Sequence, residues 1–287
     1  MLALVTAAPA LQAQGVQPQS SSFVTSDRVR LHVLEAGQAR RGQPTLAFVP
    51  GWSMPAAIWM EQLTALAATH KIVALDPRGQ GESDIPAQGY TTERRAEDLH
   101  EFVKRHAPVV LVTWSMASLE ALQYLHVHGP SKLSGLVIVD SSVGEGPSPP
   151  AAPKGAPPSG LQLELRRDRE KTVDDFVRAI FRTPQSDERI AALRASALRM
   201  PLEASLSLFP GQRIPRERWR KSVNAFPKPL MYVITPQFQD QAQSLKKHRP
   251  ATRIELFEKA GHALFVDEPE RFNAVLIDFL RMNRLGP

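Results

Sequence analysis

Cysteine is absent from this 287-residue chain. Its absence excludes a disulfide framework, a thiolate metal site and a cysteine nucleophile. Because 43% of the residues are hydrophobic, a chain of this length can bury a full core without a disulfide or a metal to stabilise it. We therefore expect one folded catalytic domain with an added segment rather than a disordered chain.

Apolar runs long enough to cross a bilayer are also missing, so no stable membrane insertion is expected. The first 13 residues are apolar but too short for a span, and they end in an Ala-x-Ala-like pattern without a preceding basic stretch. Residues 1–19 are accordingly expected to be a signal-peptide remnant or a disordered N-terminus. The first reading makes the protein periplasmic or secreted, and the second makes it cytoplasmic.

Basic runs interleaved with aromatic residues are lacking too, although the formal net charge is +6. A stacking platform for nucleic acid requires such runs, so no nucleic-acid partner is expected. Most of the net charge lies in residues 161–226, where acidic residues are interspersed with the basic ones. This mixture is typical of solvated helix faces; attraction of anionic substrates or surfaces is the alternative.

The chain does contain a regular alternation of short β-branched runs and longer helical patterns, which predicts an α/β fold with a mostly parallel sheet. Residues 29–34 alternate polar and apolar, as in an antiparallel strand near a sheet edge, paired with residues 22–25. Strands covered on both faces are expected from the apolar runs at 46–49, 72–75, 109–112, 136–139 and 230–234, and residues 254–257 are expected to form the last strand. Helical patterns lie between them at 56–68, 91–105, 116–128, 237–248 and 269–283.

The alternation is interrupted over residues 143–226, which we interpret as an inserted helical lid. A proline-rich stretch at 144–160 precedes charged helical patterns near 161–182, 186–199 and 216–222. Residues 20–142 and 227–287 then form one core domain. The alternative is a disordered linker between two domains, but the segment after 227 holds too few elements to fold alone.

Ser115 is the candidate nucleophile, because it lies in the sequence Thr-Trp-Ser-Met-Ala (113–117) between an expected strand and an expected helix. A tight strand-to-helix turn exposes the hydroxyl at a helix N-terminus, where developing negative charge is favoured. It also leaves the Met116 amide free to donate to an oxyanion. The simpler alternative is that Ser115 only caps the helix.

This layout resembles the α/β-hydrolase family over about residues 20–287, and within it the lidded esterases, lactonases and perhydrolase-like hydrolases. The family's Gly-x-Ser-x-Gly reads Thr113-x-Ser115-x-Ala117 here, with a bulkier residue at the first position. The resemblance implies an eight-stranded, mostly parallel sheet with helices on both faces and an inserted helical lid.

Two further segments carry the resemblance. Ala-Gly-His-Ala-Leu-Phe (260–265) closely resembles the family's catalytic-histidine loop, which makes His262 the general base for Ser115. Pro-Gly-Trp (50–52) resembles the family's oxyanion loop, and an ordinary turn is the alternative. The resemblance implies an oxyanion hole made by the amides of Trp52 and Met116.

The sequence Asp-Pro-Arg-Gly-Gln-Gly-Glu-Ser (76–83) is similar to a structural loop of the same family. Its glycines permit tight turns, and Asp76 with Arg78 is expected to brace the loop. We assign neither of these two residues a catalytic role.

The acid that orients the histidine has two candidates, since the family places it after either of two strands. The turn after residues 230–234 has no acid before Asp240, which falls inside the next expected helix. The run 136–139 ends directly in Asp140, 25 residues past Ser115, as in family members with the acid at that strand. We predict Asp140; a simple strand-end cap is the alternative.

Together these residues predict a serine hydrolase that cleaves a carboxylic ester or lactone through an acyl-enzyme. Its partner is a small-molecule substrate, with no cofactor and no metal. Met54, Trp59, Trp114 and Phe265 are expected to line an apolar pocket. The alternatives are perhydrolase or haloperoxidase-like activity, carbon–carbon bond hydrolysis on the same triad, and a non-catalytic small-molecule binding protein.

Overall fold

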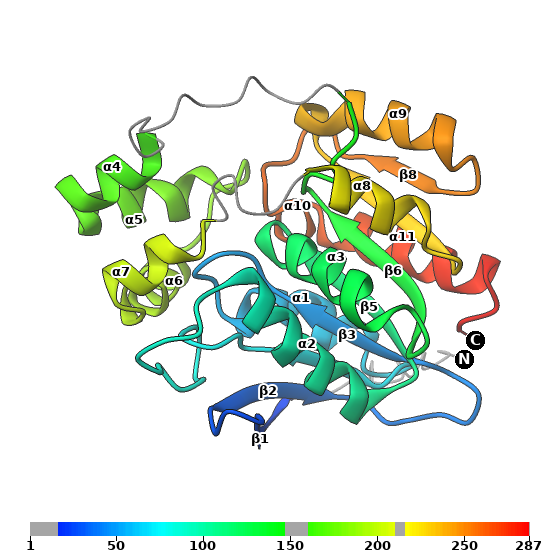
Figure 1. The fold of residues 1–287 in the computed structure, drawn as a ribbon, viewed down its shortest axis with the longest axis horizontal. Helices are drawn as coiled ribbons and strands as arrows, with labels where there is room; N and C mark the ends of the chain where they lie inside the picture. The colour runs from blue at the N-terminus through cyan, green and yellow to red at the C-terminus, as the bar shows by residue number, and fades with distance from the viewer. Residues whose placement is uncertain (1–16, 147–159, 210–215, 287) are drawn as a thin grey trace, which may run out of the picture.

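Eight strands form one sheet in the part of the chain that the computed structural model describes, residues 17–146, 160–209 and 216–286 (Figure 1). Their order is β1-β2-β4-β3-β5-β6-β7-β8. β1 and β2 pair antiparallel, β2 and β4 do likewise, and every other pair is parallel. The predicted α/β-hydrolase fold with a mostly parallel eight-stranded sheet is confirmed. The strands are β1 (Gln19–Val24), β2 (Arg30–Ala36), β3 (Thr45–Val49), β4 (Ile72–Leu75), β5 (Val109–Trp114), β6 (Leu133–Val139), β7 (Leu230–Ile234) and β8 (Arg253–Leu256).

Helices cover both faces of this sheet, which is why its central strands are apolar throughout. Alternate residues of β5 show the two faces: Val110 and Val112 pack into one layer, and Val109 and Leu111 into the other. The first layer contains α1 (Met60–Leu66) and α11 (Pro269–Met282). The second contains α2 (Thr92–His106), α3 (Met116–His128), α8 (Arg216–Asn224) and α9 (Gln239–His248). Short helical turns are η1 (Ala56–Trp59), η2 (Pro236–Phe238) and α10 (Leu264–Asp267).

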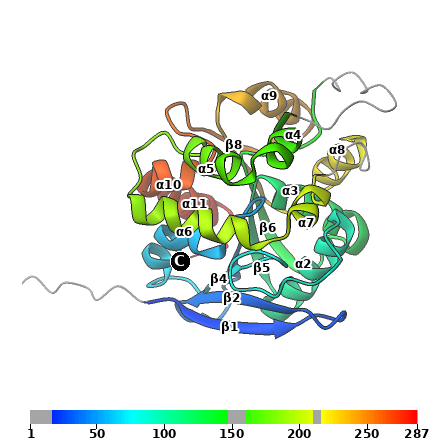
Figure 2. The same ribbon diagram turned by 90° about the vertical axis from the view of Figure 1, so that its left-hand side faces the viewer.

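Four helices lie on the side of the sheet toward which the parallel strands point, and we call them the cap (Figures 1 and 2). It consists of α4 (Gly160–Arg167), α5 (Arg169–Ala179), α6 (Asp187–Arg199) and α7 (Leu202–Ser207). The last helix of the inserted segment, α8, instead packs on α3 through the core residues Trp219 and Val223. The helices between β6 and β7 therefore both lie over the strand ends and contribute to the core.

The cap differs from the sequence prediction in two places. The expected helical segment near 161–182 is two helices, because the Asp168 carboxylate accepts the Lys171 N–H at 3.1 Å and starts α5 afresh. The short helix α7 was not predicted. It begins directly after Pro201, two residues beyond the helical pattern predicted over 186–199.

The loop after β4 is braced by Asp76 and Arg78, but through separate partners rather than through each other. Asp76 accepts the main-chain N–H groups of Ala56 and Glu82 and lies 2.7 Å from His32 Nδ1. Arg78, which is fully buried, pairs with Asp98 at 2.6 Å.

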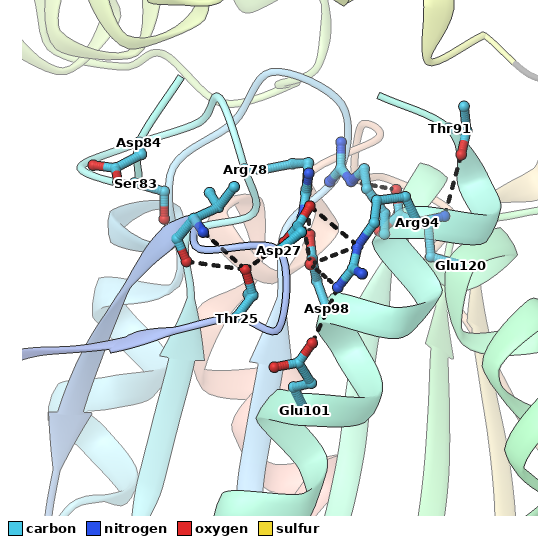
Figure 3. A network of polar contacts seen from close by, with 12 residues as sticks. Thr25, Asp27, Arg78, Ser83, Asp84, Thr91, Arg94, Asp98, Glu101 and Glu120 are labelled. Carbon is cyan, nitrogen blue, oxygen red and sulfur yellow. Dashed lines mark hydrogen bonds and ion pairs between the residues drawn. The ribbon is translucent and has the colours of Figure 1, made fainter. Parts of the chain in front are cut away.

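Figure 3 shows how this pair extends along α2. Arg94 binds both Asp98, at 2.8 Å, and Glu101, at 3.1 Å, and Asp27 contacts Arg78 at 3.0 Å. Burial opposes ionisation of Asp27, but hydrogen bonds from Thr25 and Arg78 hold its pKa below the ordinary value. The network ties α2 to the β1–β2 turn and to the loop that follows β4.

A second buried ion pair, Arg95 Nε with Glu120 Oε1 at 2.9 Å, joins α2 to α3. Burial raises the pKa of Glu120 to about 7, against the opposing charge of Arg95. Between pH 4.5, which is its ordinary pKa, and about pH 7, this carboxyl therefore holds a proton in the folded protein and releases it on unfolding. Its contribution to stability is present at low pH and is lost as the pH rises through that range.

We therefore expect Glu120→Gln to remove this pH dependence. The stability of the native protein relative to the variant should fall by about 3 kcal/mol between pH 4.5 and pH 7.5. Urea unfolding of both proteins at several pH values measures the difference, in which the other titrating groups cancel. A difference that stays constant with pH would contradict the expectation.

The N-terminal prediction concerns residues that are largely outside the described part of the chain. Residues 1–16 of the expected signal remnant lie outside it, and β1 begins at Gln19. Among the described residues, none of the helices has both the length and the apolar character that a membrane span requires.

Candidate active site

Ser115 lies at the turn between β5 and α3, in a conformation that a side chain rarely adopts. Its φ of 56° and ψ of −126° are held from both sides, because its N–H donates to Val139 of β6 and its carbonyl accepts the Ser118 N–H of α3. The residue is partly exposed, whereas β5 is buried throughout. The turn thus presents the Ser115 hydroxyl above the edge of the sheet.

The bulkier Thr113 fits this turn because its hydroxyl has a hydrogen-bonding partner within the turn. Thr113 Oγ1 lies 3.0 Å from Ser118 Oγ, and the Ser118 hydroxyl donates to the Thr113 carbonyl at 3.1 Å. Both side chains are fully buried, as is Ala117. The departure from a glycine at this position is therefore accommodated without an unpaired polar group.

His262 lies between Ser115 and Asp140 and is within hydrogen-bonding distance of both. Its Nε2 is 2.9 Å from Ser115 Oγ, and its Nδ1 is 2.7 Å from Asp140 Oδ2. The loop between β8 and α10 carries it, and Trp114 fixes that loop by donating its indole N–H to the His262 carbonyl at 2.8 Å. The structure thus brings these three predicted residues together in one line.

Asp140, directly after β6, is fully buried, and four contacts converge on its carboxylate. Oδ1 accepts the N–H of Thr235 at 2.7 Å and its hydroxyl at 2.8 Å. Oδ2 accepts the Gln237 amide at 2.7 Å besides facing His262. These contacts fix the position of the Asp140 carboxylate beside His262. Burial and the Asp140 charge both raise the pKa of the neighbouring Tyr232.

The other candidate acid, Asp240, is an exposed residue in the first turn of α9. No hydrogen bond or ion pair joins it to His262 within the described residues. The turn after β7 supplies Thr235 and Gln237 instead of an acid. Sequence reasoning examined this turn for a carboxylate and missed that its polar residues could bind the carboxylate of the neighbouring strand.

The expected oxyanion donors, Trp52 and Met116, follow β3 and β5, two adjacent parallel strands. Gly51 lies so close to the turn that an added Cβ would be 2.8 Å from Ser115 Cβ, which only glycine avoids. Neither the Trp52 N–H nor the Met116 N–H donates to another main-chain group in the described part of the chain. Both therefore remain available to an acceptor bound beside Ser115.

A cavity of about 500 Å³ opens over Ser115 and His262. The residues that the cap contributes are apolar, whereas the core side combines polar residues with the apolar Met116, Leu119 and Phe238. The lining residues used below are Phe176, Ala179, Ile180 and Phe209 from the cap and Ser142 and Gln237 from the core.

The prediction that Met54, Trp59, Trp114 and Phe265 line this pocket is wrong. None of the four is among the described residues around the cavity, and each is at most 1% exposed. Trp59 stacks on Phe265 with ring centroids 3.7 Å apart, so these aromatic side chains form the core beneath the site. The aromatic lining comes from Phe176 and Phe209 of the cap, which contact Trp52, and from Phe238 of η2. None of the three was predicted, because the direction in which a side chain points here depends on how the cap and η2 pack around the site.

Histidine and carboxylate side chains are the groups in this chain that could together bind a metal ion. Within the described ranges, no group of three or more such residues is arranged to hold a metal ion. The chemistry that the site can support from its own residues is proton transfer between a hydroxyl and an imidazole, beside two free main-chain donors.

Comparison with known proteins agrees with this architecture. A model of the alpha/beta hydrolase family matches residues 46–275. The chain belongs to this family. An AB hydrolase superfamily protein of Bacillus subtilis, YisY, is 26% identical over 89% of this chain and 97% of that protein. A pimeloyl-[acyl-carrier protein] methyl ester esterase of Vibrio atlanticus is 26% identical over 88% of this chain and 98% of that protein. The esterase EaEST of Exiguobacterium antarcticum superimposes with a TM-score of 0.77 and 20% identity, covering 91% of this chain and 99% of that one.

Proposed function

We propose that this α/β hydrolase is a serine esterase that cleaves a carboxylic ester or lactone through an acyl-enzyme. The observation that carries the proposal is the line of hydrogen bonds from Ser115 Oγ through His262 to the buried Asp140. Such a line lets an imidazole take a proton from a serine hydroxyl while a carboxylate holds the ring in place.

In the proposed reaction, Ser115 Oγ attacks the substrate carbonyl and His262 Nε2 takes the hydroxyl proton. The negative charge that develops on the carbonyl oxygen is bound by the Trp52 and Met116 N–H groups. His262 then gives its proton to the leaving alcohol, which leaves the acyl group on Ser115. A water molecule, activated by the same imidazole, releases the acid and restores the hydroxyl.

The cavity favours an uncharged substrate with an apolar group. Phe176, Ile180 and Phe209 offer apolar surface, and no lysine or arginine is among the described lining residues. A free carboxylate on the substrate would thus find no cation to pair with. The methyl ester esterases among its relatives, such as that of Vibrio atlanticus, support an ester as the scissile group.

Labelling with a fluorophosphonate probe, followed by peptide mapping, tests the proposal directly. We expect a single adduct at Ser115, since only an activated hydroxyl reacts with such probes. A panel of p-nitrophenyl esters of increasing acyl length, with several lactones, then locates the substrate class. Absence of an adduct would favour the non-catalytic alternative, and an adduct without ester or lactone turnover would direct the search to peroxide or carbon–carbon substrates.

Substitution of Ala179 by phenylalanine should shorten the accepted acyl chain. Ala179 is at the end of α5 and lines the cavity, so a phenyl ring there would fill apolar space. We expect kcat/KM for octanoate esters to fall about 10-fold or more while acetate esters change less than about twofold. Ala195→Phe, at an exposed position of α6 away from the cavity, is the matched control. Equal losses for both ester lengths would show that Ala179 does not face the acyl group.

A further inference from the structure

The side chain of Gln80 binds both ends of the loop that carries Trp52. Its Nε2 donates to the Gly51 carbonyl at 3.0 Å and to the Met54 carbonyl at 2.7 Å, and only 1% of the residue is exposed. We propose that Gln80 is a positioning residue, which orients the Trp52 N–H toward the oxyanion of the reaction. This inference rests on the proposed function.

The geometry of the peptide unit gives the reason. The Gly51 carbonyl and the Trp52 N–H belong to one planar trans peptide, so they point in opposite directions. A donor that holds the carbonyl therefore fixes the direction of the N–H at the other end of the same plane. The hydrogen bond also polarises the peptide and makes its N–H a better donor. The Cα of Gly51 lies in the same plane, and a Cβ attached to it would be 2.8 Å from Ser115 Cβ.

Little else holds this peptide plane. Within the loop itself, the Met54 N–H reaches the Gly51 carbonyl at a longer 3.3 Å. Ser53 between them has a φ of 59°, a conformation that is costly for a residue with a side chain. Without Gln80, the Met54 carbonyl would also be left in a buried environment without its donor. We infer that the loop depends on Gln80 for its active shape.

Gln80 is itself held by charged groups that the proposed chemistry does not use. Arg95 Nη1 donates to Gln80 Oε1 at 2.9 Å, so the amide must present its nitrogen to the loop carbonyls. Glu120 Oε1 lies 2.9 Å from Arg95 Nε and holds the guanidinium in place. A buried line of side chains thus runs from α3 through α2 to the oxyanion loop. The sequence had indicated only a structural loop at this point.

The test uses two substitutions that remove the donor. Gln80→Glu keeps the size and can still accept from Arg95, but an ionised carboxylate cannot donate to the carbonyls; Gln80→Met removes both contacts. We expect kcat to fall about 10- to 100-fold for each, with KM within about twofold of the native value. The affinity for a boronic acid, which forms a tetrahedral adduct on Ser115, should fall by a similar factor. If neither of these variants folds, Gln80→Asn, whose side chain is one carbon shorter, should show the same loss of kcat with KM nearly unchanged.

Gln123→Glu is the matched control, since Gln123 is also buried but lies on α3 without a contact to the loop. Its thermal midpoint should change without a selective loss of kcat. A folded Gln80 variant with native kcat and native boronate affinity would overturn the proposal. Equal losses in the Gln80 and Gln123 variants would also overturn it. Failure of the proposed function looks different, because the native protein itself would then show neither turnover nor an adduct at Ser115.

Discussion

Replacement of Ser115 by alanine is expected to lower kcat/KM for the best ester substrate about 10⁴- to 10⁶-fold. The change removes the atom that attacks the carbonyl and the hydroxyl from which His262 takes its proton, 2.9 Å away. Alanine fits the same backbone, so the strained turn with its φ of 56° is retained. Steady-state hydrolysis of the p-nitrophenyl esters measures the loss, and the residual rate reports what the oxyanion donors contribute alone.

The loss of activity is informative only if the Ser115→Ala variant is folded. The thermal midpoint and the circular dichroism spectrum of Ser115→Ala should match those of the native protein, because among the described residues the Ser115 hydroxyl is hydrogen-bonded to His262 alone. The fluorophosphonate adduct should disappear in the same variant. Retention of more than about a tenth of the native rate would show that a different group is the nucleophile.

The fold was predictable because its strands repeat one simple pattern. Residues such as Val109–Trp114 are apolar at every position, which is expected when helices cover both faces of a parallel strand. β2 was distinguished from them by its alternation of polar and apolar residues, and it pairs with β1 as predicted. The half-exposed character expected of it is not found, because Leu31, His32 and Val33 are all buried. The cap was less predictable. Its helices are short and charged, and their boundaries depend on single residues such as Asp168 and Pro201.

The site was predictable where it lies on strand ends, and less so elsewhere. Ser115, Asp140 and Trp52 follow parallel strands, so the topology itself brings them to one edge of the sheet. Proximity in sequence did not show which side chains face the cavity: Trp114 is adjacent to Ser115 and Met54 is near Trp52, yet both are buried in the core. Strand residues alternate between faces, and part of the pocket wall comes from a separate cap.

Gln80 shows a different limit. Its sequence context, between two glycines with φ of 77° and 50°, indicated a tight turn and nothing more. The contacts that give it a role join residues 51, 54, 80, 95 and 120, which no local pattern connects. Such long-range hydrogen bonds depend on how α2 and α3 pack beside the sheet. The hydrophobic periodicity of either helix does not predict that packing.

Substitution of Asp140 by asparagine should lower kcat about 10⁴-fold and leave the fold intact. Both donors of Thr235 point at Oδ1, so the asparagine oxygen will take that position. Its NH₂ group then faces His262 Nδ1 and donates to it. The imidazole is thereby forced to carry its proton on Nε2, and it can no longer accept the proton of Ser115.

Asp240→Asn is the matched control, since this exposed residue at the start of α9 has the same chemistry and no contact with His262. Its kcat should stay within about twofold of the native value. The tautomer can be read independently from the ¹⁵N chemical shifts of labelled His262, which should show a protonated Nε2 in Asp140→Asn and a protonated Nδ1 in the native protein. An inactive Asp240→Asn beside an active Asp140→Asn would move the acid to α9. The acyl-enzyme mechanism would then require a rearrangement of the turn after β7, whose Thr235 and Gln237 now hold the carboxylate of Asp140.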